Sequence, residues 1–179
     1  MSSSKKIKNS DKGIVFWITG YPGSGKSEIS NLLYNKIQKR YGKTIKFSGD
    51  ELRLLLNLKG YSKKKREKIG LLYHEICKRF SSKGVNVLID VVCLIDSVRK
   101  RNRKYINNYF EIYIKSDFKK IVKRKQKYFY KKKNKNVWGY DLKAELPKNP
   151  DITQINSFNK SLSSLTNEIF DKIKKLTKY

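Results

Sequence analysis

The sequence is poor in the residues from which disulfide frameworks, metal clusters and membrane spans are built. Only two of its 179 residues are cysteine and only one is histidine. Cys77 and Cys93 have neither metal-site spacing nor the number for a disulfide framework, so we expect two small buried apolar side chains. The longest apolar run, Ile14 to Ile18, is far too short to cross a bilayer. Residues 1–12 lack the apolar stretch of a signal peptide. We therefore predict a cytoplasmic protein without membrane association.

Acidic residues are also scarce, with 15 Asp and Glu against 43 Lys and Arg, a net charge of +28. Such a surface attracts polyanions, so nucleic acid, anionic membranes and phosphorylated small molecules are candidate partners. The abundance of Lys, Asn, Ile and Tyr is also typical of an AT-rich genome, so part of this charge needs no ligand. The length fits one domain. We predict a flexible basic tail over 1–12 and a single domain over 13–179, without internal repeats.

A phosphate-binding loop is the most specific motif in the chain. The residues from Gly20 to Ser27 spell G-x-x-x-x-G-K-S between an apolar strand and a helical pattern, which is the context that this motif requires. We expect its backbone N–H groups to bind phosphate, Lys26 to reach the β- and γ-phosphates, and the Ser27 hydroxyl to ligate Mg²⁺. The predicted ATP-binding residues are Gly20, Tyr21, Pro22, Gly23, Ser24, Gly25, Lys26, Ser27 and Glu28.

Strands and helices alternate along the rest of the sequence. Strands are predicted near 14–18, 44–47, 85–89, 110–114 and 151–155, with helices after the loop to Gly42, from Ser62 to Gly84, over about 96–107 and over the last twenty residues. This alternation predicts an α/β fold with a P-loop NTPase-type parallel sheet of about five strands and helices on both faces. Asp50 and Asp90 fall at predicted strand ends, where ligands of such sheets bind. Asp50 could alternatively cap the following helix, and Asp90 is a candidate second Mg²⁺ ligand.

The small size and the absence of a GTPase base-reading motif favour a kinase that acts on a small acceptor. Further motifs resemble the adenylylsulfate (APS) kinase family. Gly49-Asp50-Glu51-Leu52-Arg53 with Gly60-Tyr61-Ser62 and Arg66 is similar to D-G-D-x-[IL]-R and G-[FY]-S-x-x-x-R. Arg124 with residues 127–132 is similar to R-D-x-K-G-L-Y-K-K, and residues 137–150 are similar to F-T-G-I-D followed by Y-E-x-P-x-x-P. The resemblance extends from about residue 14 to the C-terminus.

The resemblance implies transfer of the ATP γ-phosphoryl group to the 3′-hydroxyl of adenosine 5′-phosphosulfate, with Mg²⁺. It implies catalytic roles for Lys26 and Asp50 and an ATP contact for Arg124. A lid over about 124–148 would close over both substrates. The residues expected to bind the acceptor are Asp50, Arg53, Tyr61, Arg66, Arg99, Lys127, Val137 and Trp138, with Tyr61 and an aromatic from Val137-Trp138 stacking on its base.

Several departures from the family pattern concern the acceptor. Ile69 stands where the family has Asn, Leu72 where it usually has Arg, and Val92-Cys93-Leu94-Ile95 where it has I-S-P-Y. Ser48 replaces an Asp, and Tyr128 a Gly. These departures concern the identity of the acceptor and leave the kinase motifs intact, and the family's own acceptor is still the favoured hypothesis. The alternative is another nucleotide, such as a cytidine diphosphate derivative used in modifying a surface polysaccharide.

Two further classes of function stay open on the sequence alone. The charge and the lysine runs at 63–66 and 131–135 suit a basic RNA-binding protein or a kinase of nucleic-acid ends, which is less favoured because no RNA-binding motif accompanies them. The lost acceptor residues suit a nucleotide-binding scaffold without catalysis. A homodimer is compatible with the sequence, which displays no interface.

Overall fold

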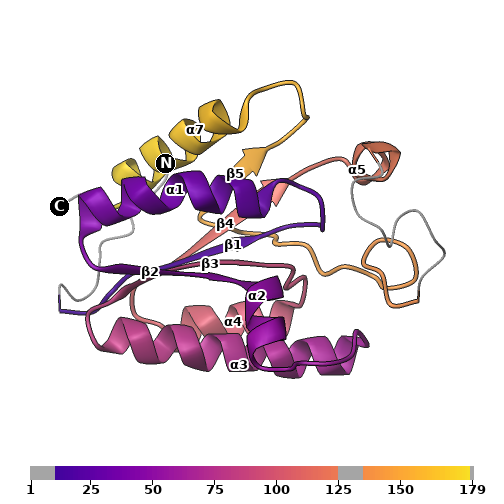
Figure 1. The fold of residues 1–179 in the computed structure, drawn as a ribbon, viewed down its shortest axis with the longest axis horizontal. Helices are drawn as coiled ribbons and strands as arrows, with labels where there is room; N and C mark the ends of the chain where they lie inside the picture. The colour runs from indigo at the N-terminus through magenta and orange to yellow at the C-terminus, as the bar shows by residue number, and fades with distance from the viewer. Residues whose placement is uncertain (1–10, 125–134, 178–179) are drawn as a thin grey trace.

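The structure, a computed structural model, describes residues 11–124 and 135–177. Five parallel strands form one sheet in the order β2-β3-β1-β4-β5 (Figure 1). The strands are β1 (Val15–Thr19), β2 (Thr44–Ser48), β3 (Asn86–Val91), β4 (Tyr109–Lys115) and β5 (Ile152–Ile155). The helices are α1 (Lys26–Tyr41), α2 (Gly49–Leu55), α3 (Lys63–Ser82), α4 (Asp96–Tyr105), α5 (Phe118–Arg124) and α7 (Leu162–Leu176). The predicted α/β fold is confirmed.

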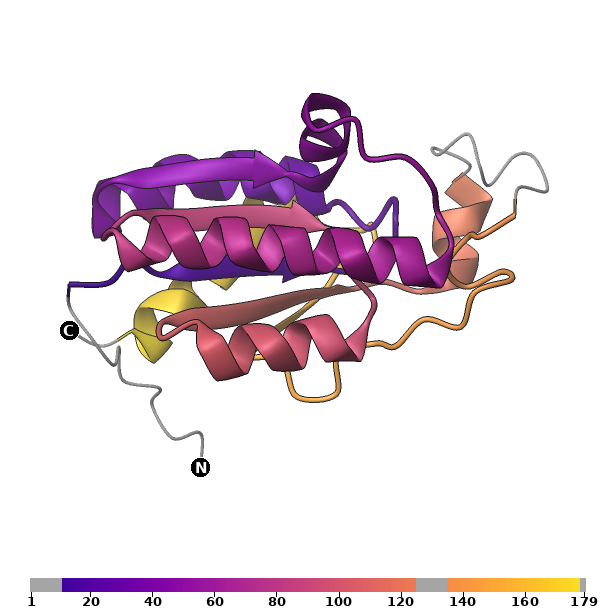
Figure 2. The same ribbon diagram turned by 90° about the horizontal axis from the view of Figure 1, so that it is seen from below.

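The sheet is covered on both faces because its central strands are apolar on both sides. Successive residues of β1 alternate between two clusters, with Trp17 in one and Phe16 in the other. Helices α1 and α7 pack on the Phe16 side, and α3 and α4 pack on the Trp17 side (Figures 1 and 2). This three-layer arrangement leaves the carboxyl ends of the strands open for loops that bind ligands.

Local signals fix the ends of the long helices. Ser62 caps α3 by accepting a hydrogen bond from the Lys65 amide, and Gly42 follows α1 with a φ of 80° that favours glycine. Helix α2 was not predicted. It is only seven residues long, and two of its leucines, Leu54 and Leu55, are strongly exposed, so its sequence does not show the regular apolar face by which a helix is recognised. Its N-cap is Ser48, and Asp50 lies inside the first turn. The expectation that Asp50 could serve as an N-cap is therefore wrong.

The predicted tail and lid are only partly described. Residues 1–10 and 125–134 lie outside the described residues, and with them most of the tail, Lys127 and Tyr128. Lys12 is tied to the domain, because its carbonyl accepts from Asn108 Nδ2 and its Nζ donates to the Ser82 carbonyl. Lys12 is therefore in contact with the folded domain. Within the described residues, no helix is long and apolar enough to cross a membrane.

The single histidine is a packing residue of the core. His74 on α3 is fully buried, and its Nδ1 lies 2.8 Å from Asn102 Oδ1 on α4. The Asn102 amide in turn donates to the Tyr109 hydroxyl. Burial lowers the pKa of His74, against the raising effect of the Asn102 bond. The folded protein therefore holds His74 neutral.

We expect this histidine to make stability depend on pH. Its folded-state pKa lies below its unfolded-state pKa, so its contribution is fully present above the unfolded value and is lost as pH falls towards the folded one. The free energy of unfolding should therefore drop between pH 7.5 and 5.5 more for the wild type than for His74→Gln. Urea unfolding at several pH values measures this. Parallel curves for the two proteins would contradict it.

Candidate functional site

The phosphate loop adopts the geometry that the motif predicts. It joins β1 to α1, and Gly25 caps the helix with a φ of 88° that side chains rarely adopt. A Cβ added at Gly20 would come within 2.5 Å of the Ile114 carbonyl oxygen, so the loop leaves the strand through a gap that only glycine fits. The amides of the first turn of α1 border the cavity described below. These features together make an anion site.

Lys26 is held in place before any ligand binds. Its side chain is only 6% exposed, and its Nζ donates to the Tyr21 carbonyl at 2.7 Å. Tyr21 itself packs against Phe118 of α5, with ring centroids 5.0 Å apart. The loop conformation therefore orients the ammonium group that would meet the phosphates.

Ser27 and Asp90 form the second polar pair of the site. The Ser27 hydroxyl donates to Asp90 Oδ1 at 2.8 Å across 63 residues of sequence. Burial raises the pKa of the Asp90 carboxyl, opposed by the Ser27 bond and by the Lys26 charge. Asp90 Oδ2 is buried and has no partner with good hydrogen-bond geometry among residues 11–124 and 135–177, although the nearby Ser30 hydroxyl also lowers the pKa of this carboxyl. An unsatisfied carboxylate oxygen beside a hydroxyl is a fitting pair of ligands for a hard cation.

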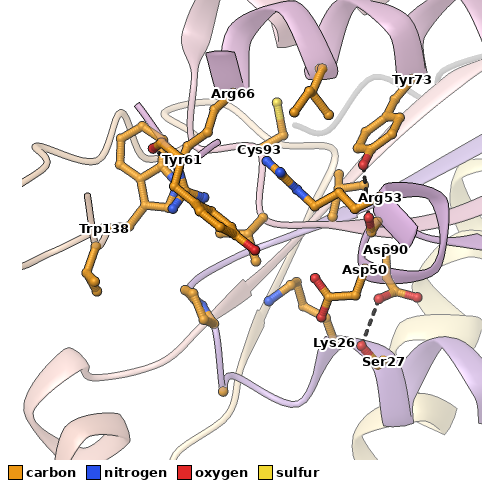
Figure 3. Close-up of a pocket in the computed structure, with 18 of the residues that line it drawn as sticks. Lys26, Ser27, Asp50, Arg53, Tyr61, Arg66, Tyr73, Asp90, Cys93 and Trp138 are labelled. Carbon is orange, nitrogen blue, oxygen red and sulfur yellow. Dashed lines mark hydrogen bonds between the residues drawn. The ribbon is translucent and has the colours of Figure 1, made fainter. Parts of the chain in front are cut away.

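One cavity of about 1100 Å³ joins this loop to the predicted acceptor residues. Figure 3 shows Lys26, Ser27, Asp50 and Asp90 on one side, and Tyr61, Arg66 and Trp138 on the other. The predicted residues that line it are Pro22, Gly23, Gly25, Lys26, Ser27, Glu28, Asp50, Arg53, Tyr61, Arg66, Asp90, Arg124, Val137 and Trp138. Segments far apart in sequence therefore converge at the carboxyl end of the sheet, as expected.

Two guanidinium groups stack on the ring of Tyr61. Arg53 lies 4.9 Å and Arg66 5.1 Å from its centroid, and Arg66 also lies 5.3 Å from the Trp138 ring. Arg66 also donates hydrogen bonds to the backbone carbonyls of Tyr61 and Asn136. It therefore holds both the residue on whose ring it stacks and the described part of the predicted lid. Burial lowers the pKa of Arg66 to about 10, with a contribution from Arg53, and the group stays charged at neutral pH. This half of the cavity suits an anion attached to an aromatic base.

Asp50 faces the cavity from the first turn of α2 (Figure 3). Tyr73 of α3 anchors this turn, because its hydroxyl donates to the Gly49 carbonyl at 2.9 Å. Burial raises the pKa of Tyr73 to about 12, so it remains a donor. The carboxylate therefore stands on a fixed backbone between the two halves of the site.

Sequence reasoning missed the residues that complete the loop side. Asn156, which follows β5 directly, donates to the Ser24 carbonyl at 3.1 Å and so holds the β5–α7 connection against the phosphate loop. Phe158 of that connection lies under the Arg124 guanidinium, 4.5 Å from centroid to Cζ. Both line the cavity. The position of Asn156 at a strand end was the available signal.

Some predicted site residues lie elsewhere. The expectation that Arg99 binds the acceptor is corrected, because Arg99 is 2% exposed, absent from the cavity lining, and occupied by Glu111 and by the Cys93 and Glu145 carbonyls. Gly20, Tyr21 and Ser24 belong to the phosphate loop but are not among the residues that line the cavity. Both cysteines are buried, as predicted, and burial raises the pKa of Cys93 to about 12.

The departures from the family pattern fall partly on the cavity wall. Ile69, Val92 and Cys93 line it, whereas Leu72 is 38% exposed and lies away from it. Val137, at the position of the family's phenylalanine, also lines it. The acceptor half therefore combines two arginines with a more apolar wall.

Comparisons with known proteins agree with this geometry. The family described as adenylylsulphate kinase matches residues 12–155. Cytidine diphosphoramidate kinase from Campylobacter jejuni is 32% identical over 163 residues, 89% of this chain and 95% of that protein. Adenylyl-sulfate kinase from Thermodesulfovibrio yellowstonii is 31% identical over 173 residues, 91% of this chain and 86% of that protein.

The same fold occurs in solved structures. The Mycobacterium tuberculosis APS kinase CysC, in complex with AMPPNP and APS, has a TM-score of 0.82 at 24% identity, covering 91% of this chain and 98% of that chain. The family match spans the phosphate loop, both arginines and the catalytic candidates Lys26 and Asp50. The chain therefore belongs to the adenylylsulphate kinase family and is a phosphotransferase.

Proposed function

We propose that this protein transfers the γ-phosphoryl group of ATP to the ribose 3′-hydroxyl of a nucleotide acceptor that carries a second anionic group. The observation that carries the proposal is the single cavity of about 1100 Å³ between the phosphate loop and the pair Arg53–Arg66. Pockets for one drug-sized ligand are about 300–1000 Å³, so this volume suits two substrates side by side. Phosphoryl transfer needs them in line and needs their charge neutralised.

The donor would lie along the phosphate loop. Its phosphates would accept hydrogen bonds from the loop amides, and Lys26 would neutralise the charge that develops on the transferred group. The Arg124–Phe158 pair offers an apolar and cationic surface at the same end of the cavity for the donor base. These contacts position ATP without any covalent role for the protein.

Mg²⁺ is the cation that Ser27 and Asp90 would hold. Among the described residues no three His, Cys, Asp or Glu side chains cluster into a metal cage, which is the usual situation for Mg²⁺ that shares its ligands with phosphates. Bound there, the cation would neutralise phosphate charge. The unsatisfied Asp90 Oδ2 supports this assignment.

Asp90→Asn is expected to raise the Mg²⁺ concentration needed for half-maximal rate about tenfold or more, because the amide keeps the shape of the carboxylate and removes its charge. Titration of Mg²⁺ at saturating ATP measures the shift. An unchanged Mg²⁺ dependence would remove Asp90 from the metal site.

The acceptor would bind on the opposite wall. Arg53 and Arg66 would bind its anionic groups, and the Tyr61 ring would stack on its base once a guanidinium leaves that face. Asp50 would then orient or deprotonate the ribose hydroxyl, which lies between the two halves of the cavity. The hydrogen bond from Arg66 to the Asn136 carbonyl joins this wall to the described part of the predicted lid.

Two acceptors fit this description, and the wall favours one. Adenosine 5′-phosphosulfate is the acceptor implied by the family and by the relative from Thermodesulfovibrio yellowstonii. Its sulfate ends in three oxygens that only accept hydrogen bonds. A phosphoramidate has two such oxygens and an amino group that donates. Ile69 and Cys93 replace the family's Asn and Ser, so this wall offers adenosine 5′-phosphosulfate fewer polar partners than the family pattern does. A one-ring base also needs less stacking area beside Val137. Together with the relative from Campylobacter jejuni, this favours cytidine diphosphoramidate.

Acceptor-dependent release of ADP tests the proposal. ATP and Mg²⁺ are offered with cytidine diphosphoramidate, adenosine 5′-phosphosulfate, CDP or a short RNA, each against a blank without acceptor. We expect turnover with cytidine diphosphoramidate to exceed that with adenosine 5′-phosphosulfate by about tenfold or more in kcat/KM, the size of one lost polar contact. The reverse order would assign the family's own acceptor. Turnover with RNA alone would support the basic RNA kinase, and no turnover with any acceptor would contradict the proposal.

A further inference from the structure

Arg99 and Glu111 form an ion pair that is shielded from solvent. Arg99 on α4 is 2% exposed and Glu111 on β4 is 3% exposed. Arg99 Nε lies 3.1 Å from Glu111 Oε1, an ion pair without hydrogen-bond geometry, while Glu111 Oε2 accepts from Arg103 Nη2 at 2.9 Å. Apolar residues in place of a buried ion pair are often neutral or stabilising, so stability alone does not account for these charges. Their geometry points to a role in positioning.

Arg99 also donates to the backbone behind the acceptor wall, and its Nη2 lies 3.3 Å from Asp96 Oδ1. Nη1 donates to the Cys93 carbonyl at 3.1 Å, and Nη2 donates to the Glu145 carbonyl at 2.7 Å. Cys93 and its neighbour Val92 line the cavity. A planar guanidinium holds its partners at fixed angles. The ion pair with Glu111 therefore sets where the wall stands relative to the centre of the sheet, since Glu111 pairs in register with Trp17 of β1.

Glu145 connects the backbone held by Arg99 to the start of α3. Its amide donates to the Leu94 carbonyl at 3.0 Å, and its Oε2 accepts from the Asp96 amide at 2.7 Å. Its Oε1 pairs with Lys63 Nζ at 2.5 Å. Lys63 is the first residue of α3, between Tyr61 and Arg66 in sequence. The contacts thus lead from the buried pair to both sides of the acceptor half.

We propose that the Arg99–Glu111 pair is a positioning device for the acceptor half of the site. It holds the wall at Cys93 and, through Glu145, the segment that carries Tyr61 and Arg66. The kinetic consequence rests on the proposed function. These contacts lead mainly to the acceptor wall and the start of α3. The link towards the phosphate loop, from the Thr19 hydroxyl to the Cys93 carbonyl, is long at 3.5 Å, so the ATP half should be much less sensitive to the pair.

Steady-state kinetics of Glu111→Gln and Arg99→Lys test the proposal. We expect the KM for the acceptor to rise about tenfold to a hundredfold, since small misplacements of substrate have effects of that size. The KM for ATP should stay within about twofold of the wild-type value, because the substitutions leave the groups proposed to bind ATP unchanged. Arg101→Gln is the matched control, since Arg101 lies on the same helix and forms an exposed ion pair with Glu75 of α3. Equal rises in both KM values would overturn the proposal.

A charge left unpaired in the core could unfold a single variant. The double substitution Arg99→Met with Glu111→Met removes both charges and keeps most of the volume, so it should fold. Methionine at position 99 has no donor for the Cys93 and Glu145 carbonyls. We therefore expect the double variant to show the same selective rise in the KM for the acceptor. A double variant with wild-type acceptor KM would assign the pair to structure alone.

Hydrogen exchange gives a readout that does not depend on the acceptor. In Glu111→Gln we expect faster exchange of amides in residues 92–96, 60–66 and 144–146, with residues 20–28 unchanged. Uniformly faster exchange would mean global destabilisation, and unchanged exchange would mean that the pair positions nothing. If the wild type phosphorylates no nucleotide offered, the proposed function fails, while the exchange experiment still decides on the positioning device.

Discussion

Lys26→Ala is expected to lower kcat by at least about a thousandfold, because this ammonium group neutralises charge where the γ-phosphoryl group is transferred. The side chain is 6% exposed and its Nζ donates to the Tyr21 carbonyl, so the ammonium group already lies at the phosphate loop before ATP binds. Steady-state and single-turnover rates with the acceptor identified by the panel measure the loss. Binding of a fluorescent ATP analogue shows how much of it arises before the chemical step.

Lys39→Ala is the matched control, since Lys39 lies on the same helix, is exposed and does not line the cavity. We expect it to keep wild-type rates. Cellular function that survives Lys26→Ala in full would contradict catalysis and support a nucleotide-binding scaffold descended from the kinases. Loss of folding, checked by thermal melting, would instead show that the Lys26–Tyr21 contact is structural.

The fold could be predicted where single residues decide local structure. The runs at 14–18 and 85–89 are apolar on both faces, which predicts buried parallel strands, and Ser62 and Gly42 mark helix ends in the expected way. Helix α2 gave no such signal, because Leu54 and Leu55 point away from any core. Its position follows from the anchoring of Gly49 by Tyr73, a contact between distant segments.

Part of the site could also be predicted from the sequence, and part of it could not. The phosphate loop is continuous in sequence, so residue order fixes its geometry. Arg99 was misplaced because a resemblance gives a position along a helix and not the direction of a side chain, which Glu111 determines here. Asn156 and Phe158 reach the cavity through contacts with Ser24 and Arg124 that no short motif encodes.

Asp50→Asn is expected to lower kcat about a hundredfold to ten-thousandfold, the range that a general base contributes. Asp50 lines the cavity and is not the cap of α2, so the substitution removes a functional charge and leaves the helix start, at Ser48, intact. The KM for ATP should change little, because in the proposed complex the loop amides and Lys26, and not Asp50, would bind the phosphates. The measurement is the rate with saturating acceptor, with melting temperature as the check on folding.

Glu51→Gln provides the matched control for Asp50, since Glu51 is the next residue of α2, exposed and away from the cavity lining. If both substitutions lower kcat alike, the effect comes from the negative charge at the first turn of α2 and not from contact with the hydroxyl. If Asp50→Asn keeps wild-type kcat while raising acceptor KM, Asp50 orients the ribose and the proton leaves to water. A selective loss of kcat in Asp50→Asn alone would mean that the carboxylate makes an interaction present only in the transition state, as a base at the reacting hydroxyl does.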